Sequence, residues 1–163
     1  MTSPEAILGY IYAVLHAPTY RSKYADFLRT DFPRIPFPER HEDFAALSKL
    51  GWALIQAHLM KAVPPRGLGA YQGKGADDVV KPRYSPQEQS VWINETKRFT
   101  RVPEHVWNFT IGGYQVIDKY LKSRKGRTLS LAEIENVENI VNVLDYTIET
   151  MAAIDVAYAT AGL

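Results

Sequence analysis

The sequence predicts an α+β fold that is mostly helical, with a small antiparallel sheet or hairpin and a long C-terminal helix. Two observations predict it. Apolar residues recur at helical spacing towards both ends of the 163-residue chain. Between them, at residues 62–102, Pro and Gly are frequent and short apolar runs alternate with polar residues, as in strands joined by turns. A chain of this length is expected to form a single domain.

Residues 1–61 are expected to form a helical scaffold. Thr2 or Ser3 can cap the first helix, and Pro18 ends it, because proline removes a backbone donor and clashes with the preceding turn. The apolar face predicted for this helix consists of Ile7, Leu8, Ile11, Tyr12, Val14 and Leu15.

Two further helices are predicted at about residues 19–29 and 42–61, joined by a proline-rich segment at residues 31–38. That segment contains three prolines, each of which disfavours helix for the residue before it. We therefore expect an extended strap laid across a surface. Its predicted anchors are Phe32, Ile35 and Phe37, and the face predicted for the helix before it is Tyr20, Tyr24, Phe27 and Leu28.

Residues 62–102 are expected to form a loop and a small sheet. A short strand is predicted around residues 79–84. Residues 89–94 and 97–102 have the composition of two strands, and the turn at Glu95 and Thr96 would join them in a hairpin.

Residues 103–163 are expected to be helical. Gly112 and Gly113 precede an amphipathic run, and such a pair can expose the first N–H groups of a helix to an anion. Ser130 and Glu133 fit a capping box that begins a final helix of about thirty residues.

Charge is segregated along this half of the chain. Eight Lys or Arg and two acids lie between Lys97 and Arg127, whereas residues 128–163 hold six acids and no Lys or Arg. The basic block, which ends in a turn at residues 122–127, predicts contacts with the phosphates and base edges of a nucleic acid. The candidate nucleic-acid-binding residues, for which the resemblance described below implies DNA as the ligand, are Arg98, Arg101, Gln115, Lys119, Lys122, Arg124, Lys125 and Arg127, with Arg66 and Lys74 in second place.

Other interpretations of these residues stay open. The basic block can be a solvated face that interacts with a helix dipole. Asp78 with Glu95 and Lys97 resembles the D…E-x-K pattern of metal-dependent nucleases, in which paired carboxylates hold Mg²⁺. A protein-interaction domain that uses the strap and the tyrosine-rich face is the third hypothesis.

Enzymatic motifs are otherwise absent from the sequence. The four histidines are scattered, no dinucleotide or P-loop fingerprint occurs, and the lack of Cys excludes disulfides and thiolate chemistry. We therefore expect no catalytic residues, no metal and no cofactor. No signal peptide and no membrane span are visible, so a cytoplasmic protein is expected.

Two long runs carry a family resemblance. GYIYAVLHAPTYRSKYADFLRTDFPRIPFP (residues 9–38) and VPEHVWNFTIGGYQVIDKYLKSRKGRTLS (residues 102–130) resemble the C-terminal specificity domain of type ISP restriction-modification enzymes, and TIETMAAID (residues 147–155) is similar to the end of that family. These enzymes join nuclease, helicase-type translocase, N6-adenine methyltransferase and target-recognition domain in one polypeptide.

The resemblance implies one DNA target-recognition domain over residues 1–163. Its partners would be double-stranded DNA, in which it recognises an asymmetric sequence, and an upstream methyltransferase domain that receives the adenine. The acidic outer face of the final helix is expected to point away from DNA. The chain has no motor, nuclease or methyltransferase motifs, so catalysis is not expected of it alone.

Overall fold

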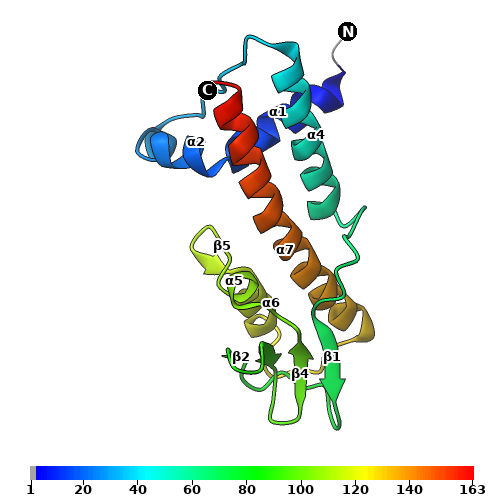
Figure 1. Cartoon of the computed structure of the whole chain (residues 1–163). Coiled ribbons are helices and arrows are strands. Elements are labelled where there is room, and N and C mark those ends of the chain that lie inside the picture. The colour runs from blue at the N-terminus through cyan, green and yellow to red at the C-terminus, as the bar shows by residue number, and fades with distance from the viewer. Residues whose placement is uncertain (1–2) are drawn as a thin grey trace. The chain divides into compact units, whose positions relative to one another are not determined.

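The computed structural model describes residues 3–163, and the chain divides into two compact units (Figure 1). The helical unit takes in the chain up to Ala62 together with Tyr146–Leu163, and the sheet unit is Val63–Asp145. The final helix, α7 (Leu131–Thr160), contributes to both. The predicted α+β class, with a small antiparallel sheet and a long C-terminal helix, is confirmed.

The helical unit begins with α1 (Pro4–His16), followed by α2 (Pro18–Lys23), α3 (Phe27–Thr30) and α4 (His41–His58). Ser3 caps α1, because its Oγ accepts a hydrogen bond from the Ala6 amide at 3.2 Å. Thr2, the other predicted cap, lies outside the described residues. The prediction of one helix over residues 19–29 is wrong, because the backbone leaves the helical conformation at Tyr24 and two short helices, α2 and α3, form instead.

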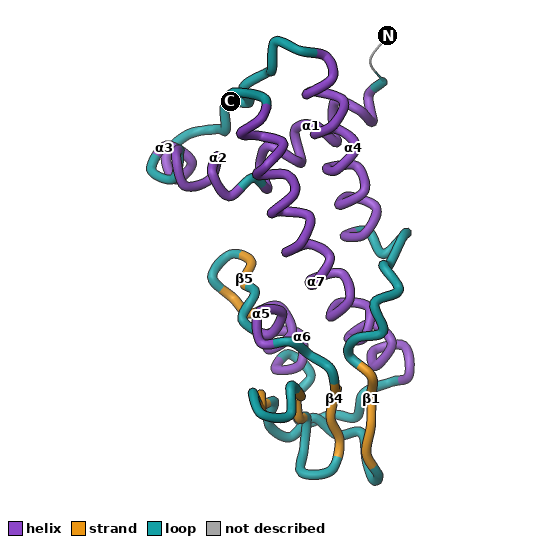
Figure 2. The backbone as a smooth tube through the Cα atoms, in the orientation of Figure 1, coloured by secondary structure: helices purple, strands orange, loops and turns teal. Residues whose placement is uncertain are grey.

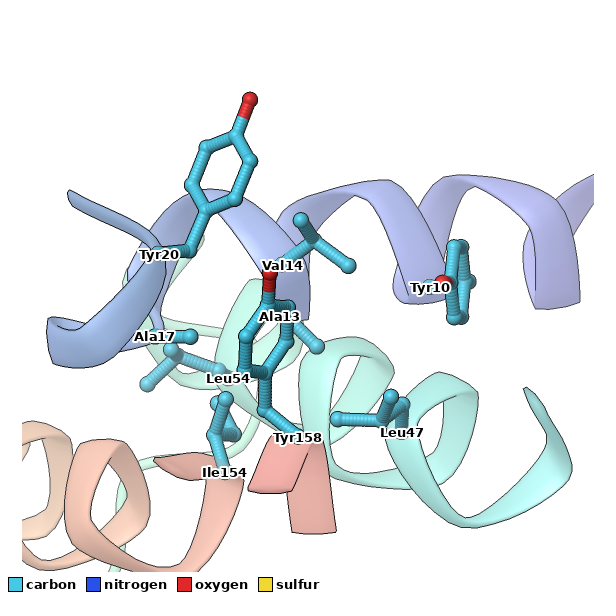
Figure 3. Close-up of a cluster of buried hydrophobic side chains, with 9 residues drawn as sticks. All are labelled: Tyr10, Ala13, Val14, Ala17, Tyr20, Leu47, Leu54, Ile154 and Tyr158. Atoms are coloured by element: carbon cyan, nitrogen blue, oxygen red, sulfur yellow. The ribbon is translucent and has the colours of Figure 1, made fainter. Parts of the chain in front are cut away.

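The core of the helical unit is built where α1, α4 and the second half of α7 meet (Figure 3). The predicted face of α1 is partly wrong, since Ile7 and Leu8 are 42% and 51% exposed. The helix buries Gly9 and its neighbours instead, because α4 crosses closely at Gly51. The buried cluster consists of Tyr10, Ala13, Val14, Ala17, Tyr20, Leu47, Leu54, Ile154 and Tyr158.

The proline-rich strap is extended, as predicted. Tyr10 and Tyr20 each donate a hydroxyl hydrogen bond to a backbone carbonyl of the strap, which ties it to the core. Ile35 packs against the core, and the Phe37 ring lies 5.0 Å from that of Tyr10. Phe32 is 86% exposed, so it is not the anchor that its position suggested.

The sheet unit contains a four-stranded antiparallel sheet in the order β1-β4-β3-β2. Its strands are β1 (Ala70–Gly73), β2 (Arg83–Ser85), β3 (Ser90–Trp92) and β4 (Lys97–Thr100). The predicted hairpin is confirmed as β3 and β4. The strand expected at residues 79–84 forms only at its end, and β1 was not predicted, because it is short and lies among glycines.

A second, two-stranded sheet separates two short helices. These elements are α5 (Glu104–Trp107), β5 (Thr110–Ile111), β6 (Tyr114–Gln115) and α6 (Val116–Lys122). Gly112 and Gly113, with φ of 58° and 82°, form the turn of the β5–β6 hairpin, because such turns need a positive φ at both positions. The expected anion site at a helix N-terminus is therefore wrong, since α6 begins only after β6.

Helix α7 begins as its sequence predicts. The Glu133 amide donates to Ser130 Oγ at 3.2 Å, and the Ser130 amide donates to Glu133 Oε2 at 3.0 Å, which is a capping box. Within the sheet unit, Asn142 of α7 forms two hydrogen bonds with the backbone of Leu68, in the loop before β1. None of the helices in the described part of the chain has the length and apolar character needed to cross a membrane.

Candidate nucleic-acid interface

One face of the four-stranded sheet carries a row of polar and aromatic side chains, one from each strand. Alternate residues of a strand point to opposite faces, so paired residues form rows across the sheet. In the order β1-β4-β3-β2, this row is Gln72, Arg98, Trp92 and Arg83. The adjacent row, on the opposite face, is Tyr71, Phe99, Val91 and Tyr84, and it contains the buried core residues Phe99 and Val91.

Two arginines stack on one tryptophan in the first row. The guanidinium carbons of Arg98 and Arg83 lie 4.6 Å and 4.9 Å from the Trp92 ring centroid. The Trp92 Nε1–H donates to Glu88 at 2.9 Å, and this hydrogen bond, more than the two arginines, holds the pKa of Glu88 below its usual value. Stacking fixes the guanidinium planes while leaving N–H groups for an anion. We call Arg83, Trp92 and Arg98 the arginine–tryptophan row.

The β5–β6 hairpin forms a second exposed feature of the sheet unit. Ile111 and Tyr114 face each other across the turn and are 61% and 59% exposed. The Lys119 ammonium lies 3.6 Å from the centroid of the Tyr114 ring. Gln115, the next residue of β6, donates to Asn108 Oδ1 at 3.2 Å. We call Ile111–Tyr114 the hairpin tip.

The basic turn at residues 122–127 is partly neutralised within the chain. Arg124 Nε and an Arg127 guanidinium nitrogen lie 2.8 Å and 2.5 Å from Glu133 Oε1. These contacts, above all the hydrogen bond from Arg127, lower the pKa of Glu133 to about 2. Lys122 pairs with Asp118 at 2.6 Å. Glu133 at the start of α7 therefore faces the basic turn.

The other candidate residues fall into two groups. Arg101, Lys125 and Lys74 are exposed, and among residues 3–163 they form no ion pair or side-chain hydrogen bond. Arg66 pairs with Asp145 at 2.7 Å, and Asp145 also contacts His105 at 2.8 Å. Exposure thus makes Arg101 and Lys125 better placed than Arg66 to reach a phosphate.

Sequence reasoning missed Arg83 and Trp92. Trp92 was assigned to a strand, and Arg83 fell at the end of the expected strand 79–84. Their alignment with Arg98 depends on the register of three strands joined by irregular loops. The only local signal is the alternation of Arg83 and Ser85 around Tyr84, which is too short to fix a register.

The nuclease pattern is not assembled as the hypothesis requires. Asp78 and Glu95 line one hollow of about 570 Å³, but Lys97 does not line it. The Lys97 ammonium pairs with Asp77 at 3.0 Å, and the Thr128 hydroxyl donates to Asp78. Across residues 3–163, no group of three His, Asp or Glu side chains is placed to hold a metal ion.

Two of the histidines meet in the helical unit. Tyr12 Oη lies 2.6 Å from His58 Nδ1, and Thr147 Oγ1 lies 2.8 Å from His58 Nε2. The His16 and His58 rings are 5.7 Å apart, and burial lowers the pKa of both. These neutral imidazoles form a hydrogen-bonded network within the helical unit, in keeping with the structural role that the sequence suggests.

Comparison with known proteins identifies one family and several structures of similar fold. The sequence model of one family, the type ISP C-terminal specificity domain, matches residues 1–153. A search among proteins of curated function finds no match.

Three solved structures share the fold. A nuclease-deletion mutant of the type ISP restriction-modification enzyme LlaGI, in complex with a DNA substrate mimic, matches with a TM-score of 0.71 and 22% identity over 93% of this chain and 14% of that one. The DrdV–DNA complex matches with a TM-score of 0.67 and 26% identity, over 94% of this chain and 18% of that one. The ATP-dependent type ISP enzyme LlaBIII bound to DNA matches with a TM-score of 0.67 and 21% identity, over 94% of this chain and 11% of that one. The chain thus spans less than a fifth of each.

Proposed function

The chain belongs to the family of type ISP C-terminal specificity domains, and from this we propose that it recognises the DNA target of a type ISP restriction-modification enzyme. It would select an asymmetric duplex sequence and present its adenine to a methyltransferase domain upstream in the same polypeptide. The three solved structures described above are complexes with DNA or a DNA mimic, which supports this ligand. Such an enzyme would act in the cytoplasm.

The observation that carries the proposal is the arginine–tryptophan row in a domain of this family. Its two guanidinium groups are held by Trp92 and by the strand register. Arginine donates two parallel hydrogen bonds to a phosphate or to a guanine edge. We assign base or phosphate contacts to Arg98 and Arg83. Phosphate contacts are assigned to Arg101 and Lys125, because both are exposed and unpaired among the described residues.

The remaining candidates have secondary roles in this proposal. Gln115 can read adenine through its amide, provided that the hydrogen bond with Asn108 opens. Lys119 contributes beside the hairpin tip, and Lys122 contributes after release from Asp118. Arg124 and Arg127 are held by Glu133, so their contribution depends on DNA displacing that carboxylate.

We assign the contact with the upstream methyltransferase domain to the helical unit. Its surface leaves several large apolar side chains in water, which is typical of a face that another domain covers. These residues are Ile7, Leu8, Phe32 and Phe37, which are 42%, 51%, 86% and 60% exposed. The chain itself is expected to bind DNA without turnover.

Selection from a randomised duplex pool tests the proposed function. The full chain is incubated with the pool at low and moderate salt, and the bound fraction is sequenced. We expect an enriched asymmetric motif whose binding weakens as salt rises, because phosphate contacts release counterions. Absence of a bound fraction at low salt would contradict the proposal. A bound fraction without an enriched motif would show that the chain contacts DNA phosphates without selecting a sequence. Magnesium-dependent cleavage of the pool that Glu95→Ala abolishes would favour the nuclease hypothesis.

Replacing Glu133 by Gln tests whether the basic turn contributes. The change removes the carboxylate charge that pairs with Arg124 and Arg127, so the positive charges of both arginines are no longer neutralised by Glu133. We expect tighter DNA binding and a salt slope that steepens by about 0.9 for each additional phosphate that the arginines neutralise, measured by fluorescence anisotropy.

Glu135→Gln is the matched control, because Glu135 lies on the same helix and the change removes the same charge, while Glu135 forms no ion pair within residues 3–163. Equal effects of the two variants would show that only net charge matters. A Glu133→Gln variant with unchanged affinity would remove Arg124 and Arg127 from the interface.

A further inference from the structure

We propose that the hairpin tip, Ile111–Tyr114, inserts into the DNA duplex and stacks its apolar side chains against bases. This inference rests on the proposed function, because it takes DNA as the ligand. It adds a distinct mode of contact: the chain would deform its target by an apolar wedge, in addition to gripping phosphates and base edges with cations.

The turn of the tip borders open space. A Cβ atom added at Gly112 or Gly113 would meet no atom within 4 Å, so nothing covers the turn in the directions in which these Cβ atoms would point. Ile111 and Tyr114 are paired across it, which places both side chains on one face of the hairpin. Figure 2 shows the β5 hairpin extending beyond α5 and α6 within the sheet unit.

The composition of the tip is unusual for a solvated turn. Hairpin turns that stay in water rarely need large side chains, yet Ile111 and Tyr114 are 61% and 59% exposed beside two glycines. Single exposed apolar residues are ordinary on proteins. Here two of them oppose each other at the end of a narrow element, which gives the pair the form of a wedge that can separate a base step.

Charge identifies DNA as the occupant. The Lys119 ammonium lies 3.6 Å from the Tyr114 ring centroid, so the aromatic side chain carries a cation with it. The surrounding segment from Lys97 to Arg127 holds eight Lys or Arg against two acids. A cation beside the ring favours a polyanion as the occupant. The apolar area of two side chains is too small to hold a protein surface by itself.

Stacking also suits the task of the proposed module. A base that is modified enzymatically must leave the duplex, and this requires unstacking. A two-stranded hairpin is narrow enough to enter a groove. Apolar side chains that occupy an opened base step replace part of the lost stacking. The tip would therefore help to open the target for the methyltransferase domain.

The test compares the variant Ile111→Ala/Tyr114→Ala with the native chain on a duplex from the selection experiment. Base–aromatic stacking predicts about a tenfold loss of affinity or more. Since neither residue is charged, the slope of log K against log salt should stay unchanged. Permanganate oxidation gives a second measurement: native chain should make a thymine near the site reactive, and the variant should not.

Two controls separate the causes. Leu59→Ala/Val156→Ala removes two exposed apolar side chains from the helical unit and should leave DNA affinity unchanged. Tyr114→Phe retains the ring and should bind nearly as the native chain does. Circular dichroism and the melting temperature show whether each variant is folded.

The outcomes distinguish this inference from the function on which it rests. Native affinity and native permanganate reactivity in a folded double variant would overturn the wedge while leaving target recognition intact. A loss of affinity that changes the salt slope would assign the effect to Lys119 and phosphate, and would also overturn the wedge. Failure of the native chain to bind any duplex would overturn both proposals.

Discussion

Gly51→Ala is expected to destabilise the helical unit by about 2 kcal/mol or more, although alanine is the better helix former by about 1 kcal/mol. An added Cβ at Gly51 would lie 1.8 Å from the Gly9 carbonyl oxygen and 2.8 Å from the Ala13 amide nitrogen. Both obstacles are backbone atoms, so no side-chain rotation can relieve the overlap. Helices α1 and α4, which share the cluster of Figure 3, must move apart. The steric cost therefore exceeds the gain in helix propensity.

Thermal unfolding followed by circular dichroism measures the effect, and the expected loss corresponds to about 4–8 °C for a chain of this size. Ala45→Gly on the exposed side of α4 is the control, because it reports helix propensity without packing. It should destabilise by about 1 kcal/mol. A Gly51→Ala variant as stable as the native chain would show that the crossing is looser than the structure indicates.

The same crossing explains why the burial of α1 could not be predicted from its apolar residues. Hydrophobic periodicity favours the side with Ile7 and Leu8, but a close approach of two backbones requires small residues. The packing partner decides which side is buried, and that partner lies some forty residues further along the chain. Helix starts were predictable because caps are local: Ser3 and the pair Ser130 and Glu133 act as their sequence suggests.

The candidate site was predictable to a similar extent. Charge segregation predicted the block of residues 97–127, which lies in the sheet unit and includes Arg98, because charge is read directly from the sequence. Arg83 lies beside Trp92 only because β2 pairs with β3, and this pairing is a property of the fold that the local sequence does not show. Likewise, no local pattern shows that Glu133, a capping residue, also binds Arg124 and Arg127. Local rules thus find capping and charge, whereas register and ion pairing across loops require the fold.

The arginine–tryptophan row leads to the largest functional effect that we expect. The double variant Arg83→Glu/Arg98→Glu should lose at least about 60-fold in DNA affinity at 0.1 M salt, because two phosphate contacts contribute about 1.8 log units through counterion release. Repulsion between the new carboxylates and the phosphates adds to this loss. If one arginine reads a guanine instead, its loss also relaxes selection at that base. Anisotropy titrations over a range of salt concentrations measure affinity and slope together.

Arg21→Glu/Lys23→Glu provides a control with the same change in net charge. Both residues are exposed on α2 in the helical unit, outside the sheet that we assign to DNA. If DNA is held only by the overall charge of the chain, the two double variants should weaken binding equally. If the sheet face is the interface, only Arg83→Glu/Arg98→Glu should flatten the salt slope, by about 1.8, because the slope counts local phosphate contacts.

Trp92→Ala should then lower DNA affinity by a smaller factor than Arg83→Glu/Arg98→Glu does, because the arginines keep their charge but lose the ring that orients them.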